Sequence, residues 1–148
     1  MPEKQTLERA REDAREGKSP TTQAGEFVRE EMHHVREGKH GAASPKQAIA
    51  IGLSKARRAG VKLPSPTGRN VSMETKEKAR RDSRGQSDSE HKVSHRRSRA
   101  TTRALKKKGR SAASKSALSK QARTVARKRG AAARHNSAVK ASRTRKAA

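Results

Sequence analysis

The sequence predicts a chain that is mostly α-helical and largely disordered, with a small helical hairpin at about residues 21–60 and a basic, conditionally helical tail. Leu, Ile, Val and Phe supply only fifteen of the 148 residues, too few for a sizeable core. Alanine, with 24 residues, favours helix but buries little surface. The formal net charge is +25, and Phe27 is the one aromatic residue. This composition excludes a transmembrane span and favours a polyanionic partner.

Charge is distributed unevenly along the chain. The first 37 residues carry slightly more acidic than basic side chains, whereas residues 91–148 carry 20 Lys and Arg and no acid. Such asymmetry between the two ends is typical of a tail that binds nucleic acid or a membrane surface. We therefore predict a charged N-terminal helix or tail (1–20), a helical-hairpin core (21–64), a linker with a weak charged helix (65–90) and a basic low-complexity tail (91–148).

Two helices are predicted before residue 40. Residues 1–18 form a charged helix with a thin apolar face. Residues 21–37 form a stronger helix, which begins after Ser19-Pro20 and ends at Gly38. Its apolar stripe consists of Phe27, Val28, Met32 and Val35.

The clearest helix signal lies at residues 44–59. The run Ser44-Pro45-Lys46-Gln47 indicates a capping box, in which Ser44 accepts from the backbone N–H of Gln47 and Gln47 reaches back to Ser44. Gly60 is suited to the left-handed residue that ends a helix, and Pro64 stops any continuation. The predicted apolar face consists of Ile49, Leu53 and Ala56, with Ile51 beside it.

The remainder of the chain has weaker patterns. Residues 72–84 are compatible with a lone charged helix that is supported by Glu/Lys and Glu/Arg pairs four residues apart. In the tail, large apolar residues are too sparse for a core. We expect fluctuating helix there, interrupted at Gly109 and Gly130.

Residues 25–64 carry a family resemblance. The segment GKHGAASPKQAIAIGLSKARRAG resembles small basic bacterial proteins that share a domain of unknown function, marked by GKHGxxSxKQAIAIGLSKARRAG. Those relatives often have a basic residue where this chain has Ala43. The resemblance implies the domain boundary, a cytoplasmic protein of bacterial type and a DNA-binding role, and no reaction. The tail also resembles the Lys/Ala-rich tails of bacterial histone-like proteins.

Two sets of residues are candidates for binding phosphate. In the tail they are Arg96, Arg97, Arg99, Arg103, Lys106, Lys107, Lys108, Arg110, Arg123, Arg127, Lys128, Arg129, Arg134, Arg143, Arg145 and Lys146. In the hairpin they are Lys39, His40, Ser44, Lys46, Lys55, Arg57, Arg58 and Lys62. The loop at residues 38–41 leads into a helix N-terminus that could hold a phosphate oxygen. Arg57, Arg58 and Lys62 lie at the C-terminal end of the same helix, where they either extend the basic surface or only interact favourably with the helix dipole. An ordinary capped connection is the alternative explanation of this loop.

No catalytic, cofactor or metal site is predicted. The chain has no cysteine and no nucleophile-elbow, phosphate-loop or dinucleotide motif, so we expect no enzyme activity. Three histidines, His33, His34 and His40, lie near Glu30 and Glu31. Adjacent helical residues point about 100° apart, so His33 and His34 cannot easily face one ion.

The sequence therefore favours a sequence-nonspecific, histone-like DNA-binding protein, cytoplasmic and nucleoid-associated, that neutralises phosphates and releases counterions. DNA is the preferred partner over RNA, and self-association through the hairpin is left open. Because no aromatic residues accompany the tail cations, base stacking is not available. The alternatives are an RNA- or ribosome-associated protein and a hydrophilic stress protectant without a specific site.

Overall fold

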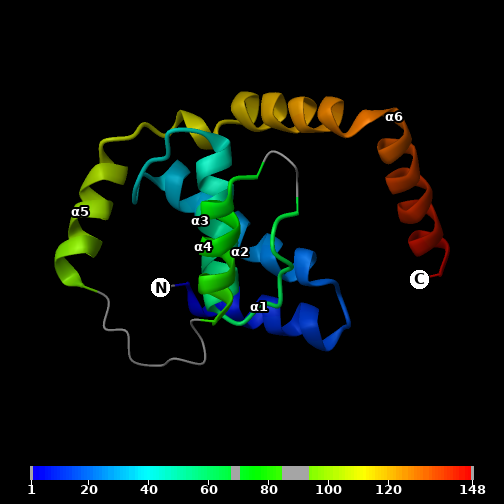
Figure 1. Cartoon of the computed structure of the whole chain (residues 1–148), viewed down its shortest axis with the longest axis horizontal. Helices are drawn as coiled ribbons and strands as arrows, with labels where there is room; N and C mark the ends of the chain where they lie inside the picture. The colour runs from blue at the N-terminus through cyan, green and yellow to red at the C-terminus, as the bar shows by residue number, and fades with distance from the viewer. Residues whose placement is uncertain (1, 68–70, 85–93, 148) are drawn as a thin grey trace.

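The computed structural model describes residues 2–67, 71–84 and 94–147, and these residues form helices and connections without a strand. The first four helices gather into a bundle, from which the segments holding α5 and α6 extend (Figure 1). No helix among the described residues is long and apolar enough to cross a membrane. The elements are α1 (Lys4–Arg15), α2 (Pro20–Glu37), α3 (Pro45–Arg58), α4 (Met73–Arg84), α5 (His95–Lys106), the 3-10 turn η1 (Ser111–Ala113) and α6 (Lys115–Ala147).

The prediction of a largely disordered chain is wrong. Helices cover most of the described residues, including the tail, so the description of the protein as intrinsically disordered is wrong as well. The reason is the composition of the core, in which alanines outnumber large apolar residues. Helices that meet through alanine and glycine approach closely and pack well. The number of Leu, Ile, Val and Phe residues does not reflect this kind of packing.

The predicted helix ends in the hairpin are confirmed. The Ser19 and Ser44 hydroxyls cap α2 and α3 by accepting from the backbone N–H three residues later. Gly38 ends α2 in the left-handed conformation, with φ of 79°. One detail of the capping box differs: the Gln47 side chain accepts from the backbone N–H of Ala43, at 2.7 Å, rather than from Ser44.

The face of α3 that is buried differs from the predicted one. Its buried residues are Ala48, Gly52 and Ala56, spaced four residues apart, while Ile49 and Leu53 are only half-buried. A Cβ atom at Gly52 would lie 2.7 Å from the Cα of Val28, so the two helix backbones nearly touch there. Small residues line this contact because larger ones would force α2 and α3 apart.

The hairpin buries its apolar side chains in two clusters. In the first, Phe27 packs with Ala10 of α1 and with Ala56, Val61 and Leu63. Because Ala10 is buried in this cluster, the predicted N-terminal helix is a packed part of the bundle. On the other side of α3, α4 contributes the buried Ala79, and the Ser54 hydroxyl donates to Asp82 at 2.6 Å.

The second cluster is completed by the tail. Ala112 and Ala113 of η1 pack with Met32 and Val35 of α2 and with Ala42 and Ala48. Backbone hydrogen bonds hold the same segment, from Gly41 N to Leu105 O at 3.1 Å and from Ala42 N to Gly109 O at 3.3 Å. The Arg36 Nε donates to Ala113 O at 3.0 Å. The tail is therefore anchored to the hairpin at its middle.

The predicted interruptions of the tail fall at the expected glycines. Gly109 lies between α5 and η1, and Gly130 kinks α6 with φ of 75°, a conformation that favours glycine. Figure 1 shows the change of direction in α6. The predicted linker 65–90 and the start of the tail at residue 91 lie partly outside the described residues.

Candidate functional site

The tail presents a basic surface. Each of the sixteen predicted phosphate-binding residues between Arg96 and Lys146 is exposed. Within the described part of the chain none of these cations forms an ion pair with a carboxylate. The hydrogen bonds that they make go to uncharged oxygens, as from Arg129 to the Ser137 hydroxyl at 2.6 Å and from Arg134 to Gly130 O at 3.2 Å. Their charge is thus directed toward solvent.

Helix α5 and the residue that caps its C-terminus place four of these cations on one face. Arg96, Arg99, Arg103 and Lys107 are three, four and four residues apart, which places them on a single stripe of the helix. They surround a shallow hollow of about 510 Å³, whose floor is Ala100 and Ala104. None of the residues of α5 is buried. The stripe is therefore free to contact an extended anion along its length.

The hairpin loop offers fewer free groups than the sequence predicted. Its backbone N–H groups at Gly41, Ala42 and Ala43 donate to Leu105, Gly109 and Gln47 respectively. The Ser44 hydroxyl is used as the cap of α3. The donors that a phosphate would need are therefore already used, by the docked tail segment and by the capping interactions of α3.

The predicted hairpin cations divide into two groups. Lys39 is exposed and bridges Glu3 and Glu37, each at 3.1 Å, while Lys55 and His40 pair with buried carboxylates. Arg57 and Arg58 donate to the backbone carbonyls of Pro64 and Ser54. Lys46 and Lys62 are exposed and have no such partner among the described residues. Phosphate contact in the hairpin stays a prediction. Of the predicted hairpin residues, these last two lysines are the best placed to make such a contact.

A buried ionic cluster lies beneath the hairpin loop. Glu30 and Glu31 of α2 are 4% and 0% exposed. The Lys55 ammonium lies 3.2 Å from Glu30 Oε1 and 2.8 Å from Glu31 Oε2. His40 Nε2 lies 3.0 Å from Glu31 Oε1. A buried carboxylate requires such compensation, because the loss of hydration is costly.

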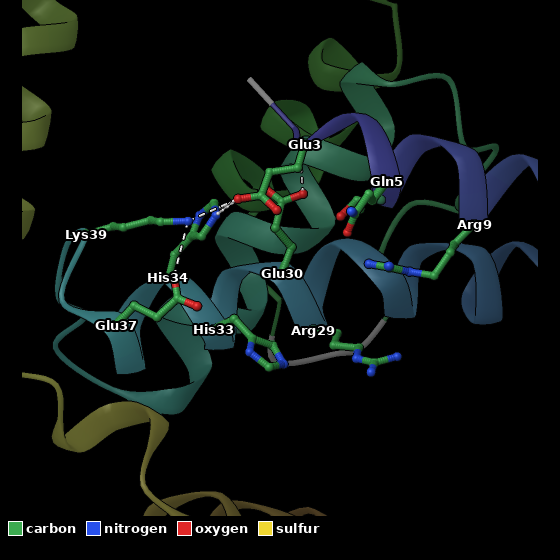
Figure 2. Close-up of a pocket in the computed structure, with 10 residues that line it drawn as sticks. Glu3, Gln5, Arg9, Arg29, Glu30, His33, His34, Glu37 and Lys39 are labelled. Carbon is green, nitrogen blue, oxygen red and sulfur yellow. Dashed lines mark hydrogen bonds and ion pairs between the residues drawn. The ribbon is translucent and has the colours of Figure 1, made fainter.

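The cluster extends to the surface through the first residues of the chain. Glu3 accepts from His34 Nε2 at 2.8 Å and from Lys39, and its backbone N–H donates to Glu30 at 3.0 Å (Figure 2). The His34 hydrogen bond, together with Lys39, lowers the pKa of Glu3 to about 2. Burial alone would raise the pKa of Glu30. The Glu3 N–H and the Lys55 ammonium oppose this effect, and the net result is a pKa below its usual value. Glu3, Glu30, His34 and Lys39 line a pocket of about 220 Å³.

The structure also gathers a set of possible metal ligands that the sequence analysis did not expect. One ligand atom from each of Glu31, His34 and His40 lies within 4.8 Å of the others. His33 is exposed and is not one of these ligands, in keeping with its predicted separation from His34. The loop carries His40 back over α2, and this return could not be read from the spacing of the histidines. A usable signal was present: Glu31 lies midway between Phe27 and Val35 on the apolar stripe, where a carboxylate needs a cationic partner.

Comparison with known proteins identifies a family that part of the chain resembles. Residues 15–66 match a family of unknown function (DUF6496). The matched segment spans α2 and α3 with the loop between them, and thus includes the ionic cluster apart from Glu3. No curated protein and no solved structure matches the chain.

Proposed function

We propose that this protein binds DNA without sequence specificity, through the exposed cations of α5 and α6. The observation that carries the proposal is the set of sixteen exposed Lys and Arg residues, none paired with a carboxylate of the described chain. Contact between these cations and phosphates releases condensed counterions, and this release drives association with any duplex. Arg and Lys contacts to phosphate position the protein without reading bases.

The anchoring of the tail changes how this binding would work. Because α5 and α6 are already helical, their cations are held at fixed spacings along two helices rather than along a flexible chain. Less conformational entropy is then lost on binding than for a segment that folds on its partner. The docked segment at residues 105–113 would in turn hold the bundle beside the nucleic acid.

The decisive experiment removes charge from α5 while leaving the fold intact. A variant with Arg96, Arg99, Arg103 and Lys107 changed to Gln is compared with a control in which Arg11, Arg15, Arg29 and Lys78, also exposed, are changed to Gln. Both variants lose four positive charges. Fluorescence anisotropy on a labelled duplex should show a weaker salt dependence only for the α5 variant, with a slope reduced by up to about 3.6. Equal losses in both variants would indicate attraction by net charge alone.

Sequencing of nucleic acid crosslinked to the protein in cells distinguishes the remaining alternatives. Enriched chromosomal DNA supports the proposal, enriched ribosomal RNA supports RNA association, and no enrichment supports a protectant role. Self-association through the hairpin stays a prediction, to be tested by the mass of the protein in solution. The apolar clusters of the hairpin are covered by α1, η1 and the start of α6 of the same chain.

A further inference from the structure

The Glu31 carboxylate in the ionic cluster is not fully satisfied by its ion pairs with Lys55 and His40. Both carboxylate oxygens of Glu31 are buried, and within the described ranges neither has a hydrogen-bond partner of good geometry, although His40 and Lys55 lie at ion-pair distance. Its Oε2 faces the Lys55 ammonium, which leaves Oε1 directed at the imidazole of His40. The chemistry of this second contact depends on which nitrogen of His40 carries hydrogen.

The loop backbone fixes that nitrogen. His40 Nδ1 lies 3.1 Å from Gly41 O, and a carbonyl oxygen only accepts, so Nδ1 carries the hydrogen. In the neutral imidazole, Nε2 is then an acceptor that faces the Glu31 oxygen at 3.0 Å. Two acceptors at this distance repel unless a positive charge lies between them, either a proton or a metal ion. A histidine whose other N–H donates to a backbone carbonyl is the usual arrangement of a metal ligand.

The charges of the network favour a divalent ion. Four carboxylates, from Glu3, Glu30, Glu31 and Glu37, are joined by ion pairs to the ammonium groups of Lys39 and Lys55. The two ammonium groups balance two of the four carboxylates, and the imidazoles of His34 and His40 lie at ion-pair distance from Glu3 and Glu31. One divalent cation held by these imidazoles would supply the remaining two positive charges where the network is most crowded.

The distances suit a tetrahedral ion after the pair at 3.0 Å opens slightly and the wider pairs close in. Ligand atoms around Zn²⁺ lie about 2.0–2.2 Å from the metal and therefore about 3.4 Å from one another. In this structure the three atoms lie within 4.8 Å, and one pair is already at 3.0 Å. Two imidazoles and one carboxylate are a known zinc donor set. His34 and His40 remain 12% and 15% exposed, which provides an entry path.

We propose that Glu31, His34 and His40 bind a divalent transition-metal ion, Zn²⁺ in the first instance. Glu31 would use Oε1 for the metal while Oε2 stays with Lys55, and Gly41 O would orient His40 from outside the ligand shell. Glu3, whose Oε1 accepts from His34 Nε2 at 2.8 Å, would orient the His34 imidazole from outside the ligand shell. The bound ion would join the loop at residues 38–44 to the middle of α2.

The test follows the histidine side chains of the full chain by two-dimensional nitrogen–proton NMR during titration with zinc chloride. We expect the ring nitrogens of His34 and His40 to shift together up to one equivalent, while those of His33, His95 and His135 stay unchanged. Simultaneous shifts of all the histidines, or no shift at His34 and His40, would overturn the proposal. This measurement needs no variant, so it is independent of any loss of folding.

Variants then locate the ligands by competition with a chromophoric zinc chelator. His34→Gln and His40→Gln should each weaken zinc binding at least about tenfold, and His40→Cys should restore it because a thiolate is a good zinc ligand. The matched control is His33→Gln, which lies one residue from His34 on the same helix and is exposed. Equal effects of His33→Gln and His34→Gln would show adventitious binding only. Circular dichroism of each variant reports whether the helices are retained.

Discussion

A Cβ atom at Gly52 would lie 2.7 Å from the Cα of Val28, so α2 and α3 meet backbone to backbone at this point. Ala48 and Ala56, one turn to either side, are fully buried in the same contact. The central contact of the hairpin therefore depends on the absence of a side chain at one position. This accounts for a packed core in a chain with few large apolar residues.

Gly52→Ala should destabilise the protein by about 1–3 kcal/mol, because the added methyl group has to displace a helix backbone. Gly25→Ala is the matched control: Gly25 also lies inside a helix, but a Cβ there meets nothing within 4 Å. This second change should stabilise by about 0.5–1 kcal/mol, since alanine loses less backbone freedom than glycine in a helix. Urea unfolding followed by circular dichroism measures both. The same sign for both changes would contradict the close contact.

Gly41→Ala should release the tail from the hairpin. A Cβ at Gly41 would overlap the backbone carbonyl of Lys108, whereas a Cβ at Gly109 has space, with its nearest neighbour at 3.9 Å. Hydrogen exchange at Ala42, which donates to Gly109 O, should accelerate in Gly41→Ala and stay slow in Gly109→Ala. Unchanged protection of Ala42 in Gly41→Ala would show that the tail is held elsewhere.

Ser44→Ala should lower the free energy of unfolding by about 1 kcal/mol, because the hydroxyl that accepts from Gln47 N is lost at the start of α3. The Gln47 side chain would still hold Ala43 N, so the helix should keep its position. Thermal unfolding compared with Ser65→Ala, an exposed serine outside any helix, isolates the cap. Indistinguishable unfolding curves would mean that the cap contributes nothing measurable.

Binding to duplex DNA should show a slope of log K against log salt near −9, if about half of the 20 tail cations contact phosphate together. Affinity should vary little between duplex sequences. Because α5 and α6 are helical before binding, circular dichroism at 222 nm should change little when DNA is added. A large gain of helix on binding would instead support a tail that folds only on its partner.

Removing residues 91–148 is not a clean test of the tail. It also removes Ala112 and Ala113 from the second apolar cluster and uncovers Met32 and Val35. The truncated chain would lose stability together with charge, so a loss of DNA binding would have two causes. Charge-neutralising changes at exposed residues keep the cluster intact and are the preferable design.

Local rules predicted the hairpin helices well, because their ends are encoded by neighbouring residues. Ser19-Pro20, Ser44-Pro45 and Gly38 act over one helical turn, and each lies at the expected helix end. The buried face of α3 was predicted less well. Apolar periodicity gives weight to Ile49 and Leu53, whereas close helix packing selects the smallest residues.

Long-range contacts could not be obtained from the sequence patterns. The docking of Ala113 on α2 joins residues 77 positions apart, as the Arg36 hydrogen bond shows, and alanine carries no signal that distinguishes a buried position from an exposed one. For the same reason the pairing of Glu31 with His40 was not predicted, although the position of Glu31 on an apolar stripe was visible. The tail cations, in contrast, could be identified from the distribution of charge along the sequence without knowledge of long-range contacts.

The contact between η1 and α2 also sets the order of events during synthesis on a ribosome. Residues 4–63 can form their helices and the first cluster as soon as they emerge, but Val35 and Met32 stay uncovered until Ala113 has left the exit tunnel. Chains that stall or are cut before this point would display an apolar patch beside exposed acidic and basic residues. Proteases and chaperones that recognise such patches could then separate unfinished chains from complete ones.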